Sequence, residues 1–229
     1  MAKPKITRIL DTLESFYGKL RAGAPTDPYE FLIWWHCGYP PSEERCEKGW
    51  QALTSQIGIA PKRLASSSTA KISAALAAGG MVPAVRTERI KEIAASVDAE
   101  HDGDLRSALA RLSPAQARKL LKTFPGIGDP GADRILLFAR ISPIAAVPSA
   151  YPHVLVRVAL GSKDEKYAAS YAAAQSMLNA LPVEFDARMR GYLLLSRHGR
   201  ELCKRTKPAC ERCPLRSMCA FAKGAKNQP

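Results

Sequence analysis

The stretch KTFPGIGDPGADRILLFAR, residues 122–140, predicts the end of one helix, a tight hairpin at PGIG (residues 125–128) and the start of a second helix. We expect Asp129 to be the N-cap of that second helix and Pro130 to be its first residue. The two glycines allow the backbone to adopt positive φ and to come close to a ligand. Backbone N–H groups beside a helix N-terminus attract anions, so the segment is typical of a phosphate-binding hairpin. A PGIG bend also serves as a plain structural turn, and the rest of the sequence must decide between the two.

The charge of the chain points to a polyanionic partner. The sequence has 229 residues, 46% of them hydrophobic, and a formal net charge of +13. An imbalance of this size favours binding to nucleic acid. A membrane surface is the rival partner, but no long amphipathic cationic helix stands out. A soluble basic protein without a polyanionic partner is the remaining alternative.

The start of the sequence, its apolar runs and its cysteines indicate the cellular compartment of the protein. The start, MAKPKITRIL, has no apolar signal region, and nowhere do eighteen apolar residues follow one another. We therefore expect an intracellular protein, in the cytoplasm or nucleoid if the source is prokaryotic. Thiols stay reduced there, so the six cysteines are expected to be metal ligands or buried thiols rather than disulfides.

Helical periodicity dominates the chain and alternation of period two is almost absent, so the sequence predicts an all-α fold. Asp27-Pro28, Ser42 and Ser113-Pro114 are expected helix starts, and Gly79-Gly80 is an expected helix end. The apolar run HVLVRVAL (153–160) is ambiguous between helix and strand. Helices are expected within 5–20, 27–36, 42–56, 70–79, 83–97, 104–112, 113–124, 171–182 and 185–203.

Four cysteines near the C-terminus form the strongest motif. Their spacing is C-x6-C-x2-C-x5-C, and the residues are Cys203, Cys210, Cys213 and Cys219. Zinc accepts four cysteines, but structural zinc sites usually pair two short knuckles, and this segment has one. A single compact loop that supplies four thiolates fits a cubane iron–sulfur cluster better. The other two cysteines, Cys37 and Cys46, are expected to be buried free thiols.

The PGIG hairpin between helices, followed by SRHGRELC (196–203) and the four cysteines, resembles the helix-hairpin-helix DNA glycosylases of the endonuclease III and adenine glycosylase type. The resemblance extends from DPYEFLIWW to Cys219 and implies two helical domains with DNA between them. Residues 27–141 would form a helical barrel that contains the helix-hairpin-helix at about 114–140. Residues 1–26 and 142–229 would form the second domain, with a [4Fe-4S] cluster in loop 203–219. The resemblance also implies double-stranded, damaged DNA as partner and flipping of the damaged base; we expect a monomer that binds no membrane.

The sequence departs from this family at the catalytic positions. Bifunctional members carry a lysine just after the hairpin, in GVGRKTA, where it attacks the sugar; here the segment is GIGDPGA, with Pro130 in its place. The aspartate of a VDTH-like stretch eighteen residues later is replaced by Pro148 in AVPSAYPH. Proline performs neither role, so lysine-dependent lyase activity is not expected and glycosylase activity by the family route is in doubt. The candidates for a substitute catalytic residue are Asp129, His153, Tyr151, Glu43 and Glu44, each with a structural alternative as cap, first-turn acid or hydrogen-bonded side chain.

The resemblance also places DNA-binding residues. Where family members insert a glutamine into the duplex, this chain has Tyr39 or Pro40, and an aromatic or proline wedge can fill a vacated stack. Trp35 and His36 are candidates for the base pocket, whereas Trp34 is expected in the core. The remaining DNA-binding candidates belong to the hairpin and to the cysteine loop: Lys122, Gly126, Ile127, Gly128, Arg200, Lys204 and Arg205.

Three functions follow from these observations. The first is a base-excision-repair enzyme, a monofunctional DNA glycosylase acting on a damaged or alkylated base whose glycosidic bond is already weak. The second is a catalytically degenerate protein that binds DNA damage or DNA structure. The third, an iron–sulfur electron carrier, leaves the hairpin and the charge unexplained.

Overall fold

The computed structural model describes residues 5–40, 42–161 and 166–224, and confirms the prediction of an all-helical fold. No strand occurs among these residues; the one β-type contact is an isolated bridge between Tyr39 and Gly80. None of the described helices is both long and apolar enough to cross a bilayer. The ambiguous run at 153–160 is a helix.

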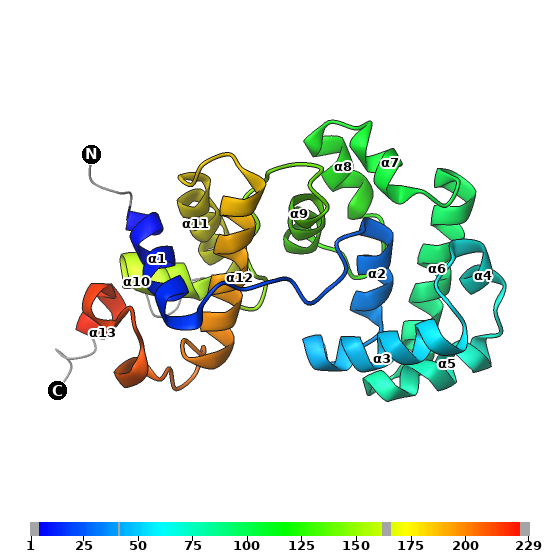
Figure 1. The fold of residues 1–229 in the computed structure, drawn as a ribbon, viewed down its shortest axis with the longest axis horizontal. Helices are drawn as coiled ribbons and strands as arrows, with labels where there is room; N and C mark the ends of the chain where they lie inside the picture. The colour runs from blue at the N-terminus through cyan, green and yellow to red at the C-terminus, as the bar shows by residue number, and fades with distance from the viewer. Residues whose placement is uncertain (1–4, 41, 162–165, 225–229) are drawn as a thin grey trace. The chain divides into compact units, whose positions relative to one another are not determined.

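The chain divides into two compact units, which are coloured along the sequence in Figure 1. The central unit comprises residues 22–141, and the terminal unit combines residues 1–21 with residues 142–229. The chain therefore leaves the terminal unit after its first helix, builds the central unit without interruption, and returns.

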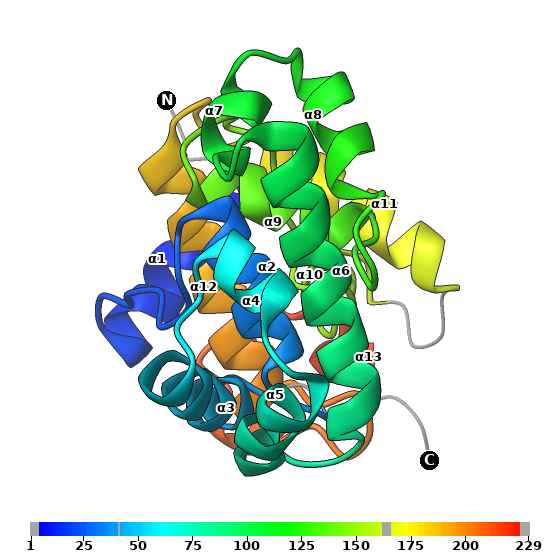
Figure 2. The ribbon, with the colours of Figure 1, turned by 90° about the vertical axis from the view of Figure 1, so that its right-hand side faces the viewer.

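The central unit contains eight α-helices among its described residues. They are α2 (Pro28–His36), α3 (Glu43–Gln56), α4 (Pro61–Ser66), α5 (Thr69–Leu76), α6 (Pro83–His101), α7 (Leu105–Ala110), α8 (Pro114–Leu121) and α9 (Asp129–Phe138), with a 3-10 turn, η1 (Ala77–Gly79), after α5. Helix α6 contacts α2, α4, α5 and α7 and is the longest element of the unit (Figure 2). It buries Ile90, Ile93 and Val97, which form an apolar stripe along the helix that packs into the core of the unit.

The helix starts of the central unit follow the sequence signals. Asp27 caps α2 by accepting from two backbone N–H groups, with Pro28 as the first helical residue. Ser42 caps α3. Ser113 and Gln116 form a reciprocal capping box at the start of α8. Gly80, with φ of 106°, ends the segment after α5 as the Gly79-Gly80 pair predicts.

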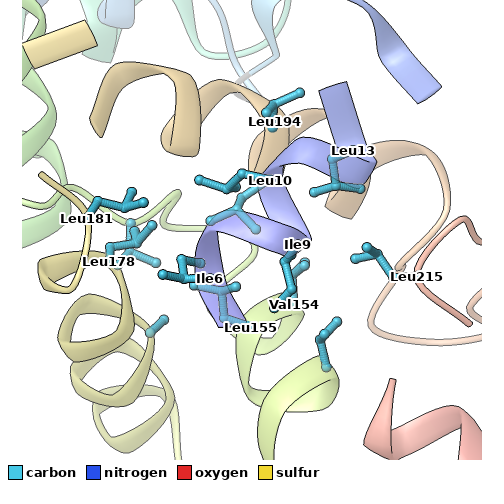
Figure 3. Packing of buried hydrophobic residues seen from close by; sticks show 14 of the residues in the cluster. Ile6, Ile9, Leu10, Leu13, Val154, Leu155, Leu178, Leu181, Leu194 and Leu215 are labelled. Atoms are coloured by element: carbon cyan, nitrogen blue, oxygen red, sulfur yellow. The ribbon is translucent and has the colours of Figure 1, made fainter. Parts of the chain in front are cut away.

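The terminal unit contains α1 (Lys5–Tyr17), α10 (His153–Leu160), α11 (Tyr167–Asn179), α12 (Phe185–Glu201) and α13 (Ala220–Gly224), with 3-10 turns η2 (Cys210–Arg212) and η3 (Arg216–Met218). Helix α1 places Ile6, Ile9, Leu10 and Leu13 at the centre of the core. Figure 3 shows these side chains facing leucines and valines of α10, α11 and α12. The N-terminal helix is therefore an integral part of the unit that carries the cysteine loop.

Candidate functional site

The hairpin between α8 and α9 has the backbone geometry that its sequence predicts. Gly126 has φ of 72°, in the left-handed region that favours glycine. Ile127 is buried and donates its backbone N–H to the carbonyl of Phe124 at 3.2 Å, which closes the turn. Gly128 is exposed and is the N-cap of α9. The bend thus presents glycine backbone at a helix N-terminus, a geometry that suits an anion.

The prediction that Asp129 is the N-cap of α9 is wrong. Gly128 takes that position and provides no side chain, so Asp129 is the first helical residue and Pro130 the second. The Asp129 carboxylate instead pairs with Lys122 at 2.6 Å and with Arg118 at 3.7 Å. The hydrogen bond from Lys122 lowers the pKa of Asp129 below its usual range. An acidic group therefore stands beside the hairpin as a counter-ion of Lys122.

A second acid fixes the two helices of the hairpin to each other. Asp133 on α9 is fully buried and accepts from Arg118 on α8 through both oxygens, at 2.7 and 3.0 Å. Bidentate pairs of this kind define the relative orientation of their helices as well as contributing energy. The sequence reasoning did not identify this pair, because nothing in the pattern marks an acid fifteen residues away as the partner of Arg118.

His36, predicted as a base-pocket residue, lies beneath the hairpin. It is the last residue of α2, is buried, and its Nε2 lies 2.9 Å from the carbonyl oxygen of Pro125. Burial lowers the pKa of His36 to about 4, so the ring is neutral at physiological pH and its Nε2–H donates to that carbonyl. Trp35 is partly exposed and stacks on Phe31, with ring centroids 6.2 Å apart, while Trp34 is buried as expected.

The loop after α2 exposes an aromatic side chain on a fixed backbone. Tyr39 is 45% exposed and Pro40 is also exposed. The backbone N–H of Tyr39 donates to Gly79, and its carbonyl accepts from the N–H of Met81. Met81 is 62% exposed and its backbone is hydrogen-bonded to that of Tyr39, so the two bonded segments form an apolar edge with two exposed side chains. Sequence reasoning missed Met81, since its relevance depends on a contact between segments forty residues apart.

A buried arginine holds this loop from below. Arg86 donates to the carbonyls of Cys37, Leu76, Gly80 and Met81, at distances of 2.7 to 2.9 Å. It is 2% exposed. Cys37 and Cys46 are buried free thiols, as expected. The pKa of the Cys37 thiol is well above its usual range because of burial, which identifies it as a packing residue rather than a nucleophile.

The four C-terminal cysteines line one small pocket of the terminal unit. Cys219 is buried, and Cys203, Cys210 and Cys213 are partly buried. Burial raises the pKa of Cys213 to about 11 and raises the pKa values of Cys203 and Cys210. Across the described ranges, no three Cys, His, Asp or Glu side chains converge closely enough to hold a single metal ion. The thiols therefore share a pocket without meeting at one point.

Two side chains from elsewhere in the terminal unit reach these sulfurs. Arg157 on α10 lies 3.8 Å from Cys203 Sγ and donates to the carbonyls of Lys204 and Arg205. His198 on α12 is fully buried, with Nε2 3.5 Å from Cys213 Sγ and Nδ1 3.1 Å from the hydroxyl of Tyr17. The HGR motif gave a signal for His198, whereas Arg157 had none.

The other catalytic candidates lie in ordinary structural environments. His153 donates its Nε2–H to the carbonyl of Cys203 at 2.8 Å, and Tyr151 packs against Gly199, where a Cβ would lie 2.4 Å from the ring. Glu44 forms an exposed pair with Lys48 on the next helical turn, and Glu43 is exposed in the same first turn. Pro148 is buried. Arg200, Lys204 and Arg205 are exposed around the cysteine loop.

Comparison with known proteins gives a match to solved structures alone. No protein-family model and no curated protein sequence matches the chain. A trapped covalent endonuclease III–DNA intermediate is 18% identical, with a TM-score of 0.74, and the match covers 99% of this chain and all of that one. A thermostable thymine-DNA glycosylase is 19% identical, with a TM-score of 0.74, over 96% of this chain and 97% of that one. The H. pylori 3-methyladenine DNA glycosylase bound to 1,N6-ethenoadenine is 18% identical, with a TM-score of 0.59, over 86% and 99%. The chain therefore shares the fold of these three structures over 86% to 99% of its length.

Proposed function

We propose, from the premise of that fold, that this chain is an intracellular DNA-binding protein of base-excision repair: a monofunctional DNA glycosylase without lysine-dependent lyase activity. The observation that carries the proposal is the hairpin at residues 125–128, set in a helical fold that matches endonuclease III over its whole length. The net charge of +13 supports a polyanionic partner. We propose damaged double-stranded DNA as the substrate and a monomer as the active form.

Two groups of exposed residues would bind DNA phosphates, one in the hairpin and one in the terminal unit. Exposed backbone at Gly126 and Gly128 would hold one phosphate, with Lys122 beside it, and such a contact fixes position without reading sequence. In the terminal unit, the exposed cations Arg200, Lys204 and Arg205 would hold further phosphates. Affinity would consequently fall steeply as salt rises, because counter-ions are released on binding.

The exposed apolar edge would act on the base stack. Tyr39, with Pro40 after it and Met81 alongside, offers two flexible or aromatic side chains on a backbone held by Arg86. Apolar side chains of this kind insert between base steps and unstack them. Trp35, which is partly exposed near the end of α2, would then stack on the flipped base.

The chemistry differs from that of the bifunctional glycosylases. Pro130 and Pro148 supply neither an amine for a Schiff base nor a carboxylate, so no covalent enzyme–sugar bond through lysine is expected. Departure of the base leaves a cationic sugar, which a carboxylate or the DNA phosphates can stabilise. Alkylated or otherwise weakened glycosidic bonds need the least stabilisation, which favours them as substrates. Asp129 is ionised beside the hairpin and is the carboxylate best placed for a role, although Lys122 and Arg118 already pair with it.

The cysteine pocket is the proposed site of a [4Fe-4S] cluster, with Cys203, Cys210, Cys213 and Cys219 as ligands. Four soft thiol donors in one pocket fit an iron–sulfur group. Structural zinc sites usually pair two short cysteine knuckles, and this loop has one. The guanidinium of Arg157 beside Cys203 would offset the negative charge of ligated thiolates. When bound, the cluster would supply a rigid scaffold for the cationic loop.

Two assays test the function. Duplexes with a panel of lesions are incubated with the protein and then treated with hot alkali, which cleaves the strand at any abasic site. Strand cleavage above background supports the glycosylase. Binding of the duplexes without base release supports the alternative, a catalytically degenerate protein that binds DNA damage or structure. Borohydride trapping serves as the second assay, and a covalent protein–DNA product would contradict the absence of a lysine nucleophile.

A further inference from the structure

A hydrogen bond between distant segments of the central unit joins α2 to the hairpin. The Nε2–H of His36 donates to the carbonyl of Pro125 at 2.9 Å, across 89 residues of sequence. A Cβ at Gly126 would lie 3.2 Å from Cε1 of the same ring. The histidine therefore bonds to the hairpin at its first residue and packs against it at its second.

The position of His36 in the chain links this contact to the exposed loop. His36 ends α2, and Tyr39 begins the apolar edge three residues later. Between them, Cys37 is fixed by Arg86, which donates to its carbonyl at 2.7 Å, and Gly38 packs so tightly against α3 that a Cβ would lie 2.4 Å from the backbone nitrogen of Cys46. The backbone from the imidazole to Tyr39 is thus held at each step.

We propose that His36 is a positioning residue that couples the hairpin to the Tyr39 loop, so that phosphate gripping and insertion into the base stack act as one unit. The inference rests on the proposed function and describes how two parts of its DNA-binding site would be coupled. It replaces the expectation that His36 lines the base pocket, since a buried ring whose Nε2–H is already donated has little to offer a base.

The physical basis is the position of the donated bond. The carbonyl of Pro125 lies directly before Gly126, which has a left-handed backbone conformation. A hydrogen bond to this carbonyl therefore restricts the backbone of the turn and the direction of its exposed N–H groups. Without the bond, the carbonyl loses its partner and the turn gains freedom, which misaligns the amides that would hold a phosphate. A displacement of the Tyr39 loop would move His36 and would change the turn through the same hydrogen bond.

The test uses three variants of the full-length protein. His36→Phe removes the donor and keeps a flat ring, and His36→Gln keeps an N–H at a comparable distance from the backbone. Tyr29→Phe is the matched control, because it removes another buried bond from α2 to a carbonyl, from the Tyr29 hydroxyl to Ile59 at 2.7 Å, far from the hairpin in sequence. Circular dichroism establishes that each variant is folded.

Affinity for a fluorescein-labelled undamaged duplex is measured by anisotropy from about 50 to 300 mM salt. Misaligned amides lose a neutral contact to phosphate, so we expect affinity to fall severalfold at every salt concentration in His36→Phe, while the slope of log affinity against log salt, which counts the cationic contacts, stays the same. We expect recovery of affinity in His36→Gln and no change in Tyr29→Phe. Amide hydrogen exchange provides a readout without DNA: the amide of Ile127 should exchange faster in His36→Phe alone.

Coupling is measured by a double-mutant cycle between Tyr39→Ala and Gly126→Ala on a duplex that contains an abasic site. We expect the two changes to be non-additive by about threefold or more in the wild-type background and additive in His36→Phe. An unchanged affinity and an unchanged coupling in a folded His36→Phe protein that binds DNA would overturn the inference. A wild-type protein that ignores DNA, with faster exchange at Ile127 in His36→Phe, would overturn the proposed function and leave the positioning contact standing.

Discussion

Protonation of His36 gives the central unit a defined dependence of stability on pH. The ordinary pKa of histidine is 6.5, and burial lowers that of His36 to about 4 in the folded state. Between these values the unfolded chain binds a proton that the folded chain excludes, so the free energy of unfolding is highest above pH 6.5 and falls as the pH drops towards 4. At 1.36 kcal/mol for each pKa unit, the full loss is about 3 kcal/mol, and most of it is reached at pH 4.5.

Tryptophan fluorescence allows the pH-dependent stability that His36 contributes to be measured in the central unit alone. All three tryptophans, Trp34, Trp35 and Trp50, lie there, whereas His198, whose pKa burial also lowers to about 4, lies in the terminal unit. Urea unfolding is followed by fluorescence at pH 7.5 and pH 4.5 for the wild type and for His36→Phe. The wild type should lose about 2 to 3 kcal/mol more than the variant between the two pH values.

A comparison between wild type and variant cancels the titration of every other group. If the two proteins lose equal stability between pH 7.5 and pH 4.5, then His36 accepts a proton without cost in the folded state. The reasoning from its burial beneath the hairpin would then be refuted.

Three further predictions follow from other contacts. Arg86→Met should lower the free energy of unfolding of the central unit by about 3 kcal/mol or more, measured by urea unfolding, because four carbonyls lose a buried donor; an unchanged midpoint would contradict this. Asp129→Asn should raise affinity for an undamaged duplex severalfold in anisotropy titrations, since it frees Lys122 beside the hairpin; loss of base release at unchanged affinity would instead identify Asp129 as catalytic. Cys213→Ser should abolish the broad visible absorbance of the proposed cluster while far-ultraviolet circular dichroism stays helical, and a colourless wild type with stoichiometric zinc would overturn the cluster.

Local signals in the sequence were sufficient for most of the helices, whereas α4 and α13 were not predicted and α10 stayed ambiguous. Capping by Asp27, Ser42 and Ser113 was predictable because each cap depends on side chains within three residues of the backbone groups it satisfies. The hairpin was predictable for the same reason. Asp129 was misassigned because an acid at a helix start suits the N-cap and the first turn equally, and only the position of Lys122 decides between them.

The site residues that escaped prediction are those whose roles depend on distant segments. His36 was predicted as a base-pocket residue from its aromatic neighbours, and its hydrogen bond to a carbonyl 89 residues away was not predicted. Arg86 and Arg157 look like ordinary helical cations in the sequence, yet both are buried donors to loop carbonyls. A periodic pattern shows which face of a helix is polar, and it does not show that one cation on that face turns inward.

The anchoring of the cysteine loop by Arg157 has a consequence for how the protein would respond to iron shortage. The guanidinium fastens the backbone at Lys204 and Arg205 and lies 4.8 Å over the ring of Phe221, so both ends of the loop are tied to α10 by the polypeptide itself. Small metal-dependent domains unfold when deprived of their ion, because little else orders them. Here Arg157 would still fasten the loop to α10 when the proposed cluster is missing.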